Sequence, residues 1–327
     1  MNFKTKKVLL SIVFSCRNDD YPNKNGINTL EFCINDLISN LRRIKLFFEI
    51  VVVEYNPLEN KKKLNHVLKL AKANNVLVNF INVPSVHHSR LKHSAYFPIS
   101  QEVAFNVGIR RSIGKYILTK NADTILNDYF YKFIKKNKLS NNYIYRCPRI
   151  DLDKQDFFKK KFEKMNNKEL FNESCGDFIL MSRESWFKIK GWWENNEAYQ
   201  DGSDSLVIES AKAVGIAEKK VENCIIFKLK HKLTHDRRTN YQYINLKISI
   251  LNLFFYKFIS ILIFLNLLKR KAEVISRDGS KKPILINIYC YDLIRKIKKN
   301  NFHVPLNLND KWGLNKIQLE ETSNKNL

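Results

Sequence analysis

The first 120 or so residues alternate between strand-like and helix-like segments, and this alternation constrains the fold more than any other feature. Short apolar runs predict strands at 8–15, 49–54, 76–83 and 116–119. Apolar residues spaced by three or four predict helices over 27–44, 64–71 and 101–113. Such alternation is typical of parallel strands joined by right-handed crossovers, with helices on both faces of an open sheet. We therefore expect a doubly wound, Rossmann-like α/β fold.

The length and the charge of the chain limit the classes of partner. Its 327 residues suffice for one large α/β domain with appendages or for two ordinary domains. Lysine plus arginine number 57 against 32 for aspartate plus glutamate, a net charge of +25. This balance indicates either a polyanionic partner or compositional drift, because Lys, Asn, Ile and Phe are frequent throughout. We do not expect nucleic acid as the partner, since no compact basic run and no RNA-binding aromatic signature occurs.

Cysteine spacing and the N-terminal segment favour a cytoplasmic protein. The six cysteines lie far apart, without a CxxC pair or a zinc-binding Cys/His spacing, which fits a reduced compartment. Residues 4–16 resemble a signal peptide, because charges precede a short apolar run. However, Phe14 before Ser15 and Cys16 suits neither a small-residue cleavage site nor a lipoprotein box. We interpret this segment as a buried first strand.

Polar side chains follow each of the predicted strands. In open parallel sheets, ligands bind outside the carboxyl ends of the strands. The segments expected at this edge are 15–20, 54–57, 84–88 and 120–123. Neither GxGxxG nor GxxxxGK[ST] occurs in the chain, which disfavours a dinucleotide oxidoreductase and a P-loop nucleotide hydrolase.

Asn121 and Asp123, at the end of the fourth predicted strand, suit a divalent cation. Magnesium and manganese prefer oxygen ligands, commonly shared between one or two carboxylates and a substrate diphosphate. A plain strand-ending turn is the alternative, because Asn and Asp also favour turns.

Residues 248–268 are the most apolar stretch and are about as long as a bilayer-spanning helix. The polar members Ser249, Asn252, Tyr256 and Ser260 recur every three or four residues, so they form a narrow stripe on one helical face. A buried helix, an interfacial amphipathic helix and a true membrane span all remain open.

Six segments occur in order along the chain: SIVFSCRNDD, EIVVVEYNP, AFNVGIRRSIGKYILTKNADTIL, CGDFILMSRESWFKIKGW, the DGSDSLVI run and LNDKWGL. Together they resemble glycosyltransferases of the GT-A fold, related to the large family two of inverting enzymes. The resemblance implies a GT-A domain over 1–236, with a nucleotide-binding half (1–125) and an acceptor and catalytic half (126–236). Residues 237–327 are then a helical C-terminal extension, which contacts the membrane if 248–268 reaches lipid.

The resemblance implies that a nucleotide-diphospho-sugar binds at the carboxyl edge of the sheet. Ser15, Arg17, Asp19 and Glu54 match positions that hold the base and ribose. Asn106 and Arg110 lie in the NVGIRR segment, which lines the donor pocket in similar sequences. Packing and solvation of an ordinary helix account equally well for the NVGIRR pattern.

The resemblance also implies a metal site, manganese or magnesium. Asp123 matches the last acidic residue of a DXD-like motif, and Asn121 stands where many members have Asp. His231 matches a late histidine that completes the metal site in some GT-A enzymes. Three residues earlier, where a second histidine is expected, the chain has Lys228, which can instead offset diphosphate charge as a point cation.

Asp204 matches the general base of the inverting enzymes. Such a carboxylate removes the proton of the acceptor hydroxyl as its oxygen attacks the anomeric carbon. The alternative is a helix N-cap, and Ser203 stands where many members have a glutamate. Asp177 is a second candidate, expected to contact donor sugar or acceptor. Trp192, Trp193 and Tyr199 suit either a sugar platform or the core.

These expectations converge on an inverting, metal-assisted glycosyltransferase. It would extend a surface polysaccharide or a glycolipid at the cytoplasmic face of the membrane, by transfer to a glycan or glycolipid acceptor. The alternative is a non-catalytic GT-A-like protein that binds a nucleotide or a glycan, which the departures at Asn121, Ser203 and Lys228 favour.

Overall fold

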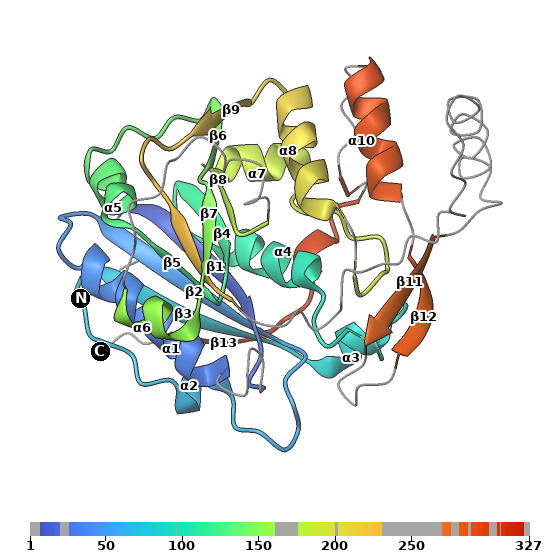
Figure 1. Cartoon of the computed structure of the whole chain (residues 1–327), viewed down its shortest axis with the longest axis horizontal. Helices are drawn as coiled ribbons and strands as arrows, with labels where there is room; N and C mark the ends of the chain where they lie inside the picture. Colours follow the sequence, from blue (N-terminus) through green and yellow to red (C-terminus); the bar gives the residue numbers. More distant parts are fainter. Residues whose placement is uncertain are drawn as a thin grey trace.

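The structure is a computed structural model, and its central feature is an eight-stranded sheet (Figure 1). It describes residues 7–19, 26–95, 97–160, 176–199, 202–230, 270–275, 281–286, 289–300, 306–307 and 309–323. The strand order is β13-β3-β2-β1-β4-β8-β6-β9. The bounds are β1 Val8–Cys16, β2 Phe47–Tyr55, β3 Val76–Val83, β4 Tyr116–Asn121, β6 Tyr143–Arg146, β8 Phe178–Ser182, β9 Ala217–Lys220 and β13 Glu320–Ser323.

The first four strands pair in parallel, as the alternating pattern predicts. β8 pairs antiparallel with β4, and β13 pairs antiparallel with β3 at the far edge of the sheet. The chain runs outward from β1 through β2 to β3 and then returns to place β4 on the other side of β1. The direction of winding therefore reverses between β1 and β4, which is where doubly wound sheets bind ligands.

Helices cover both faces of the sheet (Figure 1). One face packs against α1 (Gly26–Leu41) and α5 (Asp128–Lys135), and the other against α4 (Gln101–Arg111), α7 (Arg183–Ile189), α8 (Ser203–Ala213) and α10 (Tyr289–Asn300). Successive residues of β1 point to opposite faces, so Phe14 joins the α1 core and Val13 the α4 core. Both cores consist mainly of β-branched, leucine and aromatic side chains. The doubly wound α/β fold expected from the sequence is confirmed.

A second, three-stranded sheet lies beyond the carboxyl end of β4. It has the order β5-β10-β7, with β5 at Thr124–Leu126, β10 at Ile226–Leu229 and β7 at Arg149–Leu152. The remaining elements are α2 Leu64–Val67, α3 Ser85–Ser89, α6 Lys154–Lys159, the hairpin β11 Arg270–Ile275 and β12 Lys281–Ile286, and the 3₁₀ helix η3 Trp312–Leu314. Since β5 follows β4 after a two-residue turn, the small sheet is fixed to the edge of the large one.

The helix predicted over 64–71 ends early, at Val67. Beyond it, side chains of α1 bind the backbone: the Glu31 carboxylate accepts from the Lys69 N–H at 2.7 Å, and the Asn35 amide oxygen accepts from the Ala71 N–H at 2.7 Å. These bonds hold the segment after Val67 in a non-helical form, although its apolar spacing suits a helix.

The described part of 237–327 is mixed rather than only helical. It contains α10, the β11–β12 hairpin, η3 and β13, and β13 joins the main sheet beside β3. Residues 248–268 lie outside the described residues. Among the helices that the structure describes, none has the length and apolarity needed to cross a bilayer.

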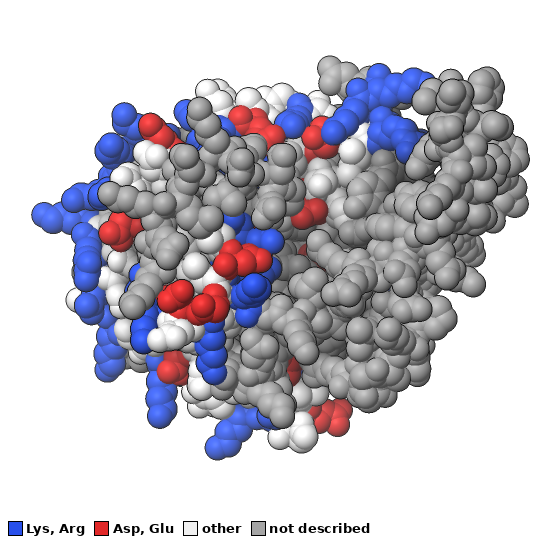
Figure 2. All heavy atoms as spheres, in the orientation of Figure 1, with Lys and Arg blue, Asp and Glu red and all other residues white. Residues whose placement is uncertain are grey.

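Charged side chains are scattered over the surface. In Figure 2, Lys and Arg side chains extend along much of the rim of the visible face, with acidic side chains between them. The charge at the ligand-binding edge of the sheet therefore depends on the individual residues that lie there.

Candidate functional site

Ser15 and Asn121 are neighbours at the point where the winding of the sheet reverses. Their Cα atoms are register partners at the carboxyl ends of β1 and β4. The Ser15 hydroxyl oxygen is buried and has no hydrogen-bond partner among the described residues. A ligand that reached this edge could satisfy the hydroxyl.

Lys120 holds the turn after β4 in place. This side chain is fully buried, and its ammonium donates to the carbonyl oxygens of Thr124 at 2.7 Å and Asn121 at 3.1 Å. It also lies over the ring of Phe14, 4.5 Å from the centroid. Burial lowers the pKa of Lys120, with nearby acidic groups acting in the opposite direction. Lys120 thus fixes the backbone that presents Asn121 and Asp123.

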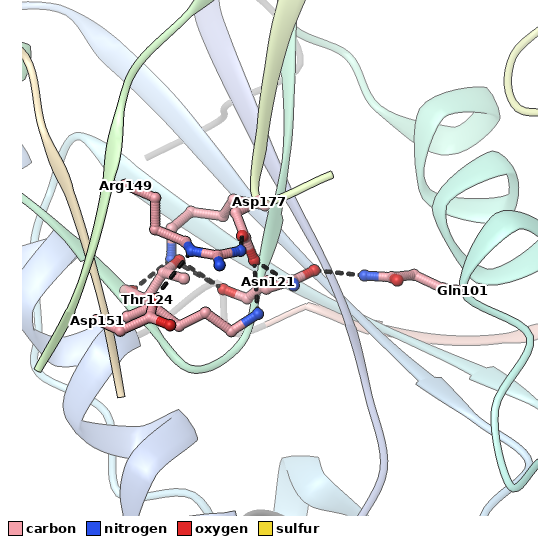
Figure 3. Close-up of polar contacts among 8 residues, drawn as sticks. Gln101, Asn121, Thr124, Arg149, Asp151 and Asp177 are labelled. Atoms are coloured by element: carbon pink, nitrogen blue, oxygen red, sulfur yellow. Dashed lines mark hydrogen bonds and ion pairs between the residues drawn. The ribbon is translucent and has the colours of Figure 1, made fainter. Parts of the chain in front are cut away.

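Asp177, just before β8, lies at the centre of the polar groups at this edge (Figure 3). One carboxylate oxygen accepts from the Asn121 amide at 2.5 Å and from the Lys228 ammonium at 2.9 Å. The other accepts from the Arg149 guanidinium at 2.6 Å. The Asn121 oxygen accepts in turn from Gln101 at the start of α4. Three residues that the sequence predicted, Asn121, Asp177 and Lys228, are therefore brought together.

Lys228 lies between the turn and β7. In the small sheet it is register partner of Thr124 on one side and Asp151 on the other. Burial acts to lower the pKa of Lys228, but the carboxylates of Asp123 and Asp177 outweigh burial and raise the pKa. Lys228 is therefore a cation at neutral pH.

Asp204 lies in the first turn of α8, beside the residue that precedes Asp177. A Cβ placed on Gly176 would be 3.4 Å from a carboxylate oxygen of Asp204, so the two segments are in close contact. The other carboxylate oxygen of Asp204 accepts from the Ser205 N–H at 2.7 Å. Asp204 is half-buried.

Glu102, in the first turn of α4, is a site neighbour that sequence reasoning missed. Its carboxylate is buried and accepts a hydrogen bond of 2.7 Å from the Ser203 hydroxyl. The pKa of Glu102 is raised to about 7, because burial, aided by the charge of Asp204, outweighs the lowering effect of the Ser203 bond. The only signal in the sequence is an acidic residue directly before the apolar run Val103–Phe105.

The other predicted base- and ribose-binding residues lie at the ends of β1 and β2. Arg17 pairs with Asp19 at 3.6 Å and donates to the Pro98 carbonyl at 3.1 Å. Glu54 accepts from the Leu64 N–H at 2.8 Å, and burial raises the pKa of Glu54 despite this bond. These residues are on the expected edge of the sheet, each already bound within the protein.

Asn106 and Arg110 are placed apart from this group. The Asn106 amide bridges the Trp192 backbone and Glu194, with three contacts of 2.7 Å. Arg110 donates to the Trp312 carbonyl at 2.9 Å and lies 3.9 Å from the centroid of its ring. Asn106 therefore attaches the segment 192–194 to α4, and Arg110 attaches the C-terminal segment to it.

The aromatic cluster divides between core and surface. Trp192 is 2% exposed and packs against Phe105 at a ring-centroid distance of 5.2 Å, so it belongs to the core. Tyr199 stacks on Phe97 at 4.8 Å. Trp193 is partly buried.

The described residues do not offer a divalent metal a fitting set of ligands. No group of three or more His, Cys, Asp and Glu side chains converges within the described ranges. Both oxygens of Asp177 face cations, and the Asn121 oxygen accepts from Gln101. Of the predicted metal ligands, Asp123 lies in this turn and His231 lies outside the described residues. We therefore assign no reaction step to a metal.

No family model matches the sequence, and no curated protein sequence matches it. Among solved structures, the Drosophila β1,4-galactosyltransferase 7 catalytic domain with xylobiose shares 13% identity at a TM-score of 0.38, over 66% of each chain. S. aureus TarS 1–349 shares 12% identity at a TM-score of 0.44, over 92% of this chain and 76% of that one. GalNAc-T7 with UDP, GalNAc and Mn²⁺ shares 13% identity at a TM-score of 0.46, over 69% of this chain and 44% of that one.

These matched proteins are glycosyltransferases of the GT-A fold, which is the fold that the sequence resemblance implies. The chain spans just under two thirds of the galactosyltransferase domain and less than half of GalNAc-T7.

Proposed function

We propose that this chain is an inverting glycosyltransferase that moves a sugar from a nucleotide-diphospho-sugar to a glycan or glycolipid acceptor. The observation that supports this most is that Asp204 of α8 lies beside Gly176, the residue that precedes Asp177 at the end of β4. A Cβ placed on Gly176 would be 3.4 Å from an Asp204 carboxylate oxygen, and Asp177 bonds to Asn121 of β4. In a doubly wound sheet this edge is the ligand-binding edge.

In the proposed reaction Asp204 is the general base. Its carboxylate takes the proton of an acceptor hydroxyl while that oxygen forms a bond to the anomeric carbon. The bond from the anomeric carbon to the diphosphate breaks, and the nucleoside diphosphate leaves with the electron pair. Configuration inverts because attack and departure occur on opposite faces. Asp204 ends the step protonated and returns the proton to solvent.

The donor is proposed to lie along the ends of β1, β2 and β4. The Ser15 hydroxyl, which is buried and without a hydrogen-bond partner in the part of the chain that the structure describes, supports a ligand at this position. Arg17, Asp19 and Glu54 flank it and are proposed to hold the base and ribose. Asn121 is proposed to lie beside the donor, and Asp177 is proposed to contact the donor sugar or the acceptor.

The role in surface polysaccharide or glycolipid synthesis, at the cytoplasmic face of the membrane, is proposed on the sequence resemblance. Mn²⁺ is named for the GalNAc-T7 structure, and a divalent metal remains a prediction for this chain. The reaction step above uses only groups of the protein.

A ligand panel tests the proposal. Thermal unfolding is measured with UDP, GDP, CDP, dTDP and their common sugar conjugates, each with and without Mn²⁺. A ligand that binds only the folded state raises the midpoint. We expect one nucleotide class to do so, and its sugar conjugate to be consumed when an acceptor is supplied. Binding without any turnover would favour the non-catalytic alternative, and absence of binding would contradict the proposed function.

A further inference from the structure

Asp177 is held between two cations that come from different strands of the small sheet. Lys228 of β10 contacts one carboxylate oxygen at 2.9 Å, and Arg149 of β7 contacts the other at 2.6 Å (Figure 3). Arg149 also pairs with Asp151 at 2.9 Å. The Asp177 side chain is 4% exposed, whereas Lys228 and Arg149 are 15% and 23% exposed. The carboxylate is thus buried behind the two cations, which retain access to solvent.

Backbone pairing fixes the positions of both cations. β10 pairs with β7 in parallel and with β5 antiparallel, so Lys228 lies between Thr124 and Asp151. The N–H of the following residue, Leu229, donates to the Asp123 carbonyl at 3.0 Å. The Lys228 ammonium is therefore held at the turn where the strands β4 and β5 meet.

A divalent metal and this arrangement compete for the same oxygens. Hard cations need carboxylate or carbonyl oxygens, and the two oxygens of Asp177 already face positive charges. Lys228 and Arg149 would repel a further double charge placed beside them, against the attraction of the Asp123 and Asp151 carboxylates that also lie near these two cations. A diphosphate has the opposite sign and suits the two cations directly.

We propose that Lys228 and Arg149 form an anion site that binds a diphosphate without a divalent metal. An arginine guanidinium has five N–H donors in a planar fork that matches phosphate oxygens, and an ammonium has three. Each cation therefore has donors beyond its bonds to Asp177. The inference rests on the proposed function, because the diphosphate is that of the sugar donor. It assigns a role to Arg149 and replaces the predicted metal with protein cations.

The test measures binding of inorganic pyrophosphate and of UDP and GDP to the full chain by calorimetry, in EDTA and then in Mn²⁺. We expect binding in EDTA that Mn²⁺ changes by less than about twofold.

Lys228→Met and Arg149→Met should each weaken this binding at least about tenfold, since a charge-assisted bond is lost. Lys228→Arg should retain most of the binding affinity measured in EDTA. Lys135→Met is the matched control, because it removes an exposed lysine of α5 with the same change in net charge.

Thermal unfolding of each variant in the absence of ligand shows whether it is folded. Asp177→Asn gives a second measurement that does not remove a cation. Without the competing carboxylate, pyrophosphate should bind equally well or more tightly in EDTA. If Asp177 were a metal ligand, this variant would instead lose the effect of Mn²⁺.

The outcomes separate this inference from the proposed function. Binding that requires Mn²⁺ and survives Lys228→Met would overturn the metal-free site but leave a diphosphate-binding enzyme. Failure of pyrophosphate, UDP and GDP to bind under every condition would contradict the anion site. The proposed function would be contradicted only if CDP, dTDP and the sugar conjugates also failed to bind.

Discussion

The Ser203 hydroxyl donates a 2.7 Å hydrogen bond to the buried carboxylate of Glu102, which ties the first turn of α8 to the first turn of α4. Asp204 is the next residue, so the bond helps to fix the carboxylate proposed as the base. The sequence resemblance implies a missing carboxylate at position 203. The structure instead brings a carboxylate to Ser203 from the neighbouring helix.

Glu102 should make the stability of the protein depend on pH. Its pKa is raised to about 7 by burial, so between about pH 4.5 and 7 the unfolded chain releases a proton that the folded chain keeps. Stability should therefore fall as pH rises through this window, by an amount on the order of 3 kcal/mol from this group. In Glu102→Gln the fall should be smaller, as measured by urea unfolding at pH 5 and pH 8.

Glu184→Gln is the control for this prediction. Glu184 also lies in the first turn of a helix, α7, but it is exposed. Its unfolding curves should differ from the wild type equally at both pH values. An unchanged pH dependence in Glu102→Gln would show that Glu102 does not titrate in this range.

Asp204→Asn should abolish turnover and spare donor binding. Removing a general base typically costs a factor on the order of 10²–10⁴ in rate. The amide keeps the size of the side chain and its bond to the Ser205 N–H. Turnover of the sugar conjugate found by the ligand panel is measured together with its dissociation constant. Asp128→Asn, in the first turn of α5, is the matched control and should retain both. Retained turnover in Asp204→Asn would remove Asp204 from the role of base.

Arg110→Met should lower stability without weakening donor binding. The variant loses the 2.9 Å bond to the Trp312 carbonyl, a bond to the Asp310 carbonyl and the contact with the Trp312 ring. Together these are worth about 1–3 kcal/mol of unfolding free energy, measured by urea titration. Arg183→Met should change it by less than about 0.5 kcal/mol. Arg183 is an exposed arginine over the Phe187 ring. A loss of nucleotide affinity in Arg110→Met would restore the donor-binding role predicted from the sequence.

Lys120→Met should loosen the turn that carries Asn121 and Asp123. Methionine fills nearly the same volume, but the carbonyl oxygens of Asn121 and Thr124 lose a buried donor. The expected loss is about 1–3 kcal/mol of unfolding free energy. Lys115→Met is the control, since Lys115 is an exposed lysine near the start of β4. Equal stability of the two variants would show that the buried ammonium does not hold the turn.

The fold was largely predictable because local patterns decide it. The apolar run at 76–83 coincides with β3, and the helix predicted from 101 begins there in the structure. The pattern over 64–71 misled because side chains of Glu31 and Asn35 on α1 capture its backbone. These bonds form because α1 lies beside the segment after Val67, and the spacing of apolar residues within 64–71 cannot predict that contact.

The site was predictable only in part. Asn121, Asp177 and Lys228 were chosen from the resemblance, and the structure brings them into contact. Arg149 belongs to no recognisable motif. It reaches Asp177 because β7 pairs with β10, and this pairing could not be predicted from the sequence. Conversely, the Asn106 side chain binds the Trp192 backbone, and Arg110 binds the Trp312 carbonyl of η3.

The place of β13 in the sheet has a consequence for synthesis. β13 at Glu320–Ser323 covers the outer edge of β3, about 240 residues earlier in the chain, where the Ser323 hydroxyl bonds to Asn79 at 2.5 Å. A ribosome therefore has to translate about 240 further residues after β3 before this edge can be paired. Until then the growing chain carries an open strand edge, the kind that pairs with other chains. The rate of translation between β3 and β13 thus sets how long the nascent protein is exposed to misassembly.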